Sequence, residues 1–195
     1  ASGQYQNVTG QTICKQCPPG TRRVQNKNQD QQHWNYRWVL LFRQTVLENK
    51  NPWDDLYGNG QLFVNPDDPT QSDYSNLGNI NDYKNDDGTY HMKILWPMST
   101  THTGYNEWKQ TSNPATSTSV TGYSAIHEDY AGNGWAGLAL SGNTNDCLID
   151  GSPGDSSTWY YCLGAYEVGS YPIPGPTSDG ENQVELWIYT NKFIA

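Results

Sequence analysis

Five stretches of the chain have the length of β-strands and are rich in apolar and aromatic residues. They cover residues 38–45, 89–96, 135–140, 159–166 and 183–189. In the second stretch Tyr90, Met92, Ile94 and Trp96 alternate with less apolar residues, and the last stretch alternates in the same way. A period of two residues places one face of a strand against a core. The pattern therefore predicts five strands that contribute to a core.

Polar segments dominated by Asn, Asp, Gly, Ser, Thr and Pro separate these stretches, notably residues 49–88 and 98–121. After the second of these segments, residues 123–130 are consistent with a short strand or a single helical turn. No segment sustains the period of about 3.6 residues that an amphipathic helix requires. The sequence therefore predicts a mainly β protein with few short helices and long loops.

Length and charge narrow the class of protein and its partners. The 195 residues suffice for one domain with a hydrophobic core and a small appendage. The 11 basic and 20 acidic residues give a formal net charge of -9. An acidic surface repels phosphate backbones and anionic lipids, so we expect no binding to nucleic acid or to a membrane surface. The longest apolar run, residues 38–42, is far shorter than the ~18 residues of a membrane-spanning helix, so no membrane span is predicted.

Four cysteines, Cys14, Cys17, Cys147 and Cys162, allow three pairings. A redox or zinc role for Cys14 and Cys17 lacks its usual context, because no strand–helix pattern flanks them and the other two are not spaced as a second zinc pair. Disulfide bonds are the favoured interpretation, and they indicate an oxidising compartment. Asn7 begins an Asn-Val-Thr triplet, which is an acceptor sequence for N-glycosylation.

Residues 3–21 contain a Gly-x-Tyr motif, then Thr-Gly, then Cys-Lys-Gln-Cys-Pro-Pro-Gly-Thr. This order resembles one unit of the ephrin-A receptor-like cysteine-rich repeats. The resemblance implies an extracellular segment with disulfides, either between Cys14 and Cys17 or from these residues to further repeat units. We therefore divide the chain into a repeat remnant with a polar linker, 1–33, and a mainly β globular domain, 34–195. We expect the protein to be secreted and extracellular.

Four parts of the domain point to one family. They are the run 38–43, the Ser-Asp-Tyr-Ser-Asn sequence at 72–76, Cys147 with the aromatic residues that precede Cys162, and the stretch 184–189. These features resemble those of fibrinogen-related domains, including the intelectin-type lectins. The resemblance implies an α+β fold, a disulfide between Cys147 and Cys162, and calcium held by acidic residues near Cys147. The residues alone do not distinguish this fold from a β-sandwich of jelly-roll type.

Acidic residues gather in three polar segments, and carboxylates on loops are usual ligands of calcium. The groups are Asp67, Asp68 and Asp73; Asp82, Asp86 and Asp87; and Asp146, Asp150 and Asp155. In the third group, Asp146 and Asp150 are the candidate calcium ligands because they flank Cys147. The alternative is that these acidic residues only form turns, in which Asp is common.

Aromatic residues beside polar ones suggest a carbohydrate-binding surface. Sugar C–H groups pack on aromatic rings, and sugar hydroxyl groups bind carboxylates and amides. Tyr105, Asn106, Glu107 and Trp108 combine both features within a segment that we expect to be a loop, and Trp135 is a further candidate. The alternative is that these aromatic residues belong to the core.

The chain contains no nucleophile-elbow, zinc-protease or P-loop motif, and we do not expect it to be an enzyme. The favoured function is a secreted, lectin-like protein that binds carbohydrate with the assistance of calcium. The first alternative is a structural or adhesive protein of the extracellular matrix that self-associates into homo-oligomers. The second is a glycan-acting hydrolase, which would use two carboxylates. Its candidates are Glu107, Glu128, Glu167 and Glu185.

Overall fold

The computed structural model of the chain describes residues 21–23, 37–46, 61–141, 147–153, 160–165 and 173–192. The elements are β1 (Thr21–Arg23), β2 (Arg37–Thr45), β3 (Tyr74–Ser75), the 3-10 helix η2 (Leu77–Tyr83), β4 (Tyr90–Leu95), β5 (Tyr105–Gln110), β6 (Ser124–Glu128), β7 (Ala139–Leu140), β8 (Ile149–Asp150), β9 (Ile173–Pro174), β10 (Gly180–Glu181) and β11 (Gln183–Thr190). The protein is mainly β with little helix, as the sequence predicts. Within the described residues, no helix is long and apolar enough to cross a membrane.

Some predictions fall on other parts of the chain. Asn7, Cys14, Cys17 and Asp146 lie outside the described residues, as does nearly all of the predicted repeat remnant. The glycosylation site, the first disulfide and the two-part division of the chain therefore stay predictions.

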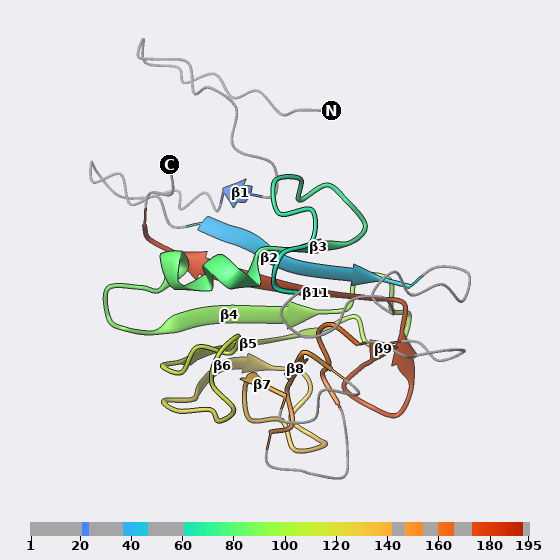
Figure 1. Cartoon of the computed structure of the whole chain (residues 1–195). Coiled ribbons are helices and arrows are strands. Elements are labelled where there is room, and N and C mark those ends of the chain that lie inside the picture. The colour runs from blue at the N-terminus through green and yellow to red at the C-terminus, as the bar shows by residue number, and fades with distance from the viewer. Residues whose placement is uncertain are drawn as a thin grey trace, which may run out of the picture.

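A seven-stranded antiparallel sheet forms the framework. Its strands follow the order β1-β2-β11-β4-β5-β6, with β3 also paired to β2. Figure 1 shows this order from top to bottom, with β11 in the middle between β2 and β4. The last long strand thus joins the first long strand to the β4–β5–β6 meander. The core strands predicted at 38–45, 89–96 and 183–189 are confirmed as β2, β4 and β11.

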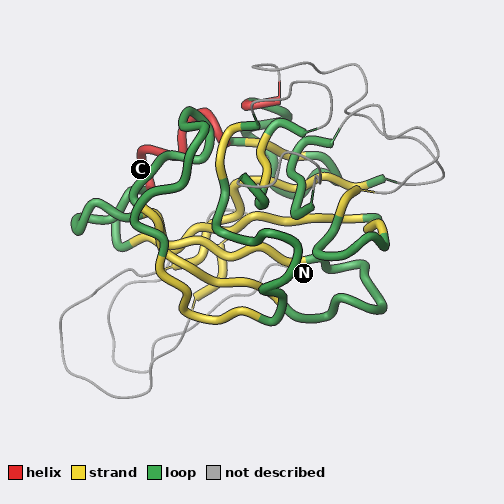
Figure 2. Tube along the Cα trace, turned by 90° about the horizontal axis from the view of Figure 1, so that it is seen from below, coloured by secondary structure: helices red, strands yellow, loops and turns green. Residues whose placement is uncertain are grey.

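One face of the sheet carries the main core. Tyr90, Met92 and Ile94 alternate inward along β4, and Leu186 and Ile188 lie opposite them on β11. The core is completed by η2 and by the irregular segments between β6 and β11. Figure 2 shows the helical segments, in red, on one side of the strands. The sheet therefore has an inner face, buried under this layer, and an opposite face whose side chains are mostly half-exposed.

A disulfide joins Cys147 to Cys162, with their Cα atoms 5.8 Å apart, as predicted. It ties the segment before β8 to residues 160–165, which carry Leu163 in an isolated bridge to Ile149. Both cysteines are buried in the core. The bridge therefore fixes part of the layer that covers the inner face.

Two predicted strands are wrong in whole or in part. Of residues 135–140, only β7 forms a strand, because Gly137 has a φ of 91° that breaks the extended backbone before it. Of residues 159–166, the described part contains no strand, and Tyr161 and Gly164 adopt φ values of 56° and 69°. A high content of aromatic residues was therefore not sufficient to predict a strand at 159–166.

Two strands lie where the sequence led us to expect a polar loop or left the structure open. β5 falls within the segment 98–121, and β6 settles the choice at 123–130 in favour of a strand. The two strands pair with each other and extend the sheet beyond β4.

Candidate functional site

The four candidate residues at 105–108, which we expected in a loop, form part of a strand. These residues lie on β5, where successive side chains point to opposite faces of the sheet. Asn106 and Trp108 are fully buried on the inner face, whereas Tyr105 and Glu107 are half-exposed on the opposite face. The indole N–H of Trp108 donates to Gln110 Oε1 at 2.8 Å. The prediction that all four residues form one surface is therefore wrong, and Trp108 is a core residue.

Asn106 and Trp135 also have structural partners. The Asn106 amide donates to the backbone oxygen of Tyr130 at 2.6 Å and accepts from its N–H at 3.0 Å. Trp135 is 8% exposed, and its ring meets that of Trp108 edge-on at 4.8 Å between centroids. Its indole N–H donates to the hydroxyl of Tyr123 at 2.8 Å. The expectation that Trp135 lines an open ligand surface is therefore wrong.

At least two of the acidic residues in the predicted groups, Asp150 and Asp87, act as turn acceptors. Asp150 Oδ1 accepts from the Ser152 N–H at 2.7 Å and from its hydroxyl at 2.9 Å. Hydrogen bonds from the Thr89 hydroxyl and N–H likewise hold the pKa of Asp87 below its usual value. Among the described residues no three acidic, His or Cys side chains form a group that could hold a metal ion. Because Asp146 lies outside them, calcium stays a prediction.

The most distinctive surface is the half-exposed face of the sheet, which we call the outer face. Its side chains lie in rows across four neighbouring strands, β2, β11, β4 and β5. The residues are Trp38, His91, Lys93, Tyr105, Glu107, Lys109, Trp187 and Tyr189. One row runs Trp38, Tyr189, His91, Lys109, each directly opposite the next. The outer face thus combines four aromatic rings of Trp and Tyr with histidine, carboxylate and ammonium groups.

Contacts between these side chains hold the outer face in one arrangement. The His91 ring lies 5.3 Å from that of Trp38 and 5.0 Å from that of Tyr189. The Lys93 ammonium lies 4.2 Å from the ring of Trp38 and 5.4 Å from that of Tyr105. Both cation–π distances are within the range of a favourable interaction. The rings of Trp38, Tyr105 and Tyr189 are therefore held by contacts with their neighbours.

His91 is also held by Glu107. The Nε2 atom of His91 lies 2.7 Å from Glu107 Oε1. Burial lowers the pKa of His91 below its usual value, and the nearby carboxylate of Glu107 opposes this effect only in part. Neutral imidazole therefore donates from Nε2 to the carboxylate. The pair presents a fixed acceptor oxygen on the outer face.

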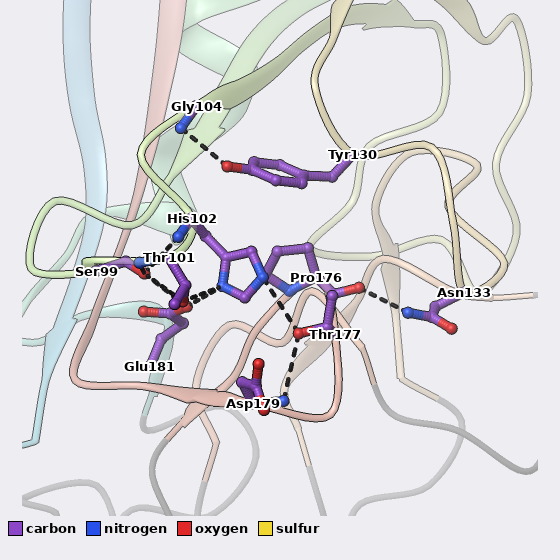
Figure 3. A network of polar contacts seen from close by, with 10 residues as sticks. All are labelled: Ser99, Thr101, His102, Gly104, Tyr130, Asn133, Pro176, Thr177, Asp179 and Glu181. Atoms are coloured by element: carbon purple, nitrogen blue, oxygen red, sulfur yellow. Dashed lines mark hydrogen bonds and ion pairs between the residues drawn. The ribbon is translucent and has the colours of Figure 1, made fainter.

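A second polar cluster lies where the loop after β4 meets the turn between β9 and β10. Figure 3 shows His102 between Glu181 and Thr177. The Nδ1 atom of His102 is hydrogen-bonded to Glu181 Oε1, and its Nε2 atom lies 3.2 Å from Thr177 Oγ1. The Ser99 hydroxyl donates to the same carboxylate oxygen at 3.0 Å. Because Thr177 and Glu181 lie more than 70 positions along the chain from His102, no local sequence pattern predicted this cluster.

Comparison with known proteins adds no relative: no family model, no curated protein and no solved structure matches the chain. The function of the chain is therefore inferred from the geometry of the outer face and of the cluster around His102.

Proposed function

We propose that the protein is a secreted, lectin-like protein that binds carbohydrate on the outer face. The observation that supports this most is the set of half-exposed Trp and Tyr rings beside Glu107 and Lys109. Aromatic rings match the C–H faces of sugars, while carboxylate and ammonium groups pair with hydroxyls. The Cys147–Cys162 disulfide agrees with an oxidising, extracellular location.

The rigidity of the outer face favours this use. The Trp38 ring contacts both the His91 ring and the Lys93 ammonium. A surface that is preorganised in this way loses little conformational entropy on binding. The net charge of -9 also favours a neutral glycan over a polyanion.

Binding of the full chain to a glycan array, followed by titration with the best glycan, tests the proposal. Tyr105→Ala and Trp187→Ala each remove one ring from the outer face, and we expect about ten-fold weaker affinity for each. Phe63→Ala is the matched control, because Phe63 is 48% exposed and lies against Gly78 of η2, away from the outer face. The affinity of the Phe63→Ala variant for the glycan is expected to equal that of the wild type.

Two results would count against this function. The absence of any glycan binding by the wild type would overturn it, and unchanged affinity in both ring variants would remove the outer face as the site. Repeating the titration with a chelator tests the predicted assistance by calcium, since only a calcium-assisted site weakens when the ion is removed.

A self-associating matrix protein is the second candidate. The edge strand β6 supports it, because all five of its residues are exposed and Ile126 is 50% exposed. A large exposed apolar side chain on an edge strand is a candidate contact between copies of a protein.

A further inference from the structure

We propose that Thr177, His102 and Glu181 form a nucleophile–base–carboxylate triad that hydrolyses neutral carboxylic esters. The three groups stand in line, with the carboxylate on Nδ1 of the imidazole and the hydroxyl on Nε2 (Figure 3). This is the arrangement that activates a hydroxyl nucleophile, and it is recognised by geometry and not by sequence position.

The hydrogen-bond network determines where the protons lie. Glu181 Oε1 receives the Ser99 hydroxyl and faces Nδ1 of His102. A carboxylate only accepts, so Nδ1 carries a proton, and in the neutral imidazole Nε2 then presents its lone pair. The Thr177 hydroxyl, 3.2 Å away, therefore donates to Nε2. That is the protonation state from which a histidine can act as general base.

The three residues of the triad differ in burial, and the proposed nucleophile is the most exposed of them. The side chains of His102 and Glu181 are 7% and 3% exposed, whereas Thr177 is half-exposed. The Tyr130 ring meets the imidazole edge-on at 5.3 Å and holds its plane. The buried base thus lies behind a half-exposed threonine.

The surroundings of Thr177 indicate the class of substrate. The backbone N–H of Asp179 lies 3.3 Å from Thr177 Oγ1, so a donor sits next to the atom that would attack. The exposed carboxylate of Asp179 and the net charge of -9 disfavour anionic substrates. A neutral ester fits these conditions.

The reaction needs no co-reactant other than water. Thr177 Oγ bonds to the ester carbonyl carbon while its proton moves to His102 Nε2. The alcohol then leaves with that proton as the C–O bond to it breaks, and an acyl-threonine remains. Water repeats the sequence: it gives a proton to Nε2, bonds to the acyl carbon and releases the acid, and Thr177 Oγ regains the proton. Glu181 is a positioning residue that stabilises the transient imidazolium.

Hydrolysis of p-nitrophenyl acetate by the full chain tests the proposal. We expect Thr177→Val to lower the rate of hydrolysis by about 100-fold, or to the uncatalysed rate if that is reached first. We expect Thr177→Ser to keep the rate of the wild type. Thr103→Val is the matched control, since Thr103 is exposed in the loop beside His102 and has no place in the triad. Equal rates in the wild type and Thr177→Val would overturn the triad.

A second measurement needs no variant. An alkyl fluorophosphonate loses fluoride to an activated hydroxyl and leaves a stable phosphonyl ester on it. Peptide mass spectrometry of the treated wild type is expected to find the adduct on Thr177, and prior unfolding in denaturant is expected to abolish it. An unmodified Thr177 in the treated wild type would contradict the proposal. So would equal labelling of Thr177 in a chain that was unfolded before the reagent was added. Both experiments can fail while glycan binding on the outer face succeeds, so the two proposals are separable.

Discussion

His91 links burial, charge and aromatic packing in a single side chain. Its ring contacts those of Trp38 and Tyr189, and its Nε2 lies 2.7 Å from Glu107 Oε1. Desolvation disfavours the imidazolium form, and the Glu107 carboxylate favours it. The first effect is the larger, so the pKa of His91 is lowered from 6.5.

Acidic pH is therefore expected to destabilise the protein through His91. The unfolded chain takes up the proton near pH 6.5 and the folded state only at lower pH. The stability linked to this group is fully present above that value and is lost as pH falls through the folded-state pKa. Denaturant unfolding at pH 7.5 and 5.0 should show a smaller loss in His91→Gln than in the wild type. An NMR titration that puts the pKa of His91 above 6.5 would refute this.

The strand β5, which the sequence pattern did not predict, shows how a buried strand can lack an apolar alternation. Its inner face carries Asn106, Trp108 and Gln110, two of which are amides, so apolar alternation is absent. Gln110 is buried because its side chain bonds the backbone N–H and C=O of Leu138 at 3.1 and 2.8 Å. Buried polar groups need such partners, and a partner distant in sequence leaves no local signal. The apolar strands β4 and β11 carried their signal within themselves and were predicted.

Trp108 and Tyr105 on this strand form a matched pair for testing the two faces. Trp108→Ala is expected to lower the free energy of unfolding by about 3–5 kcal/mol, because it removes a fully buried indole. Tyr105→Ala is expected to lower it much less, since that ring is half-exposed. Urea unfolding of both variants measures the difference. Equal losses would mean that β5 does not divide its residues between a core and an open face.

At the scale of the whole molecule, both candidate sites depend on contacts between elements far apart in the chain. Trp38 and His91 are neighbours across Tyr189 only because β11 inserts between β2 and β4. Thr177 and Glu181 reach His102 through the turn between β9 and β10. Sequence alone identified Tyr105 and Glu107 as candidates, but it had no access to the strand order that sets their neighbours. Periodicity identifies faces of single elements, whereas a site needs the pairing of elements far apart in the chain.

The strand β6, which ends the sheet among the described residues, bears on the choice between the two proposed functions. Along β6, Glu107 pairs with His127 and Trp108 with Ala125, so Ile126 is an extra residue in a β-bulge. A bulge twists an edge strand and blocks regular pairing with another chain, and the adjacent charges of Glu128 and Asp129 add to this protection. We therefore expect that the wild type does not associate through this edge and that sedimentation equilibrium gives the mass of a monomer.

Deleting Ile126 provides the test of that protection. The deletion places Ala125 directly after the His127 pair, restores a regular ladder and exposes a flat edge, so we expect self-association that rises with concentration. Ile126→Ser is the control, because it removes the exposed apolar side chain but keeps the bulge, and it should remain monomeric. A wild type that assembles with concentration, and loses assembly in Ile126→Ser, would show that Ile126 is an adhesive contact. That result would favour the matrix protein over the carbohydrate-binding protein.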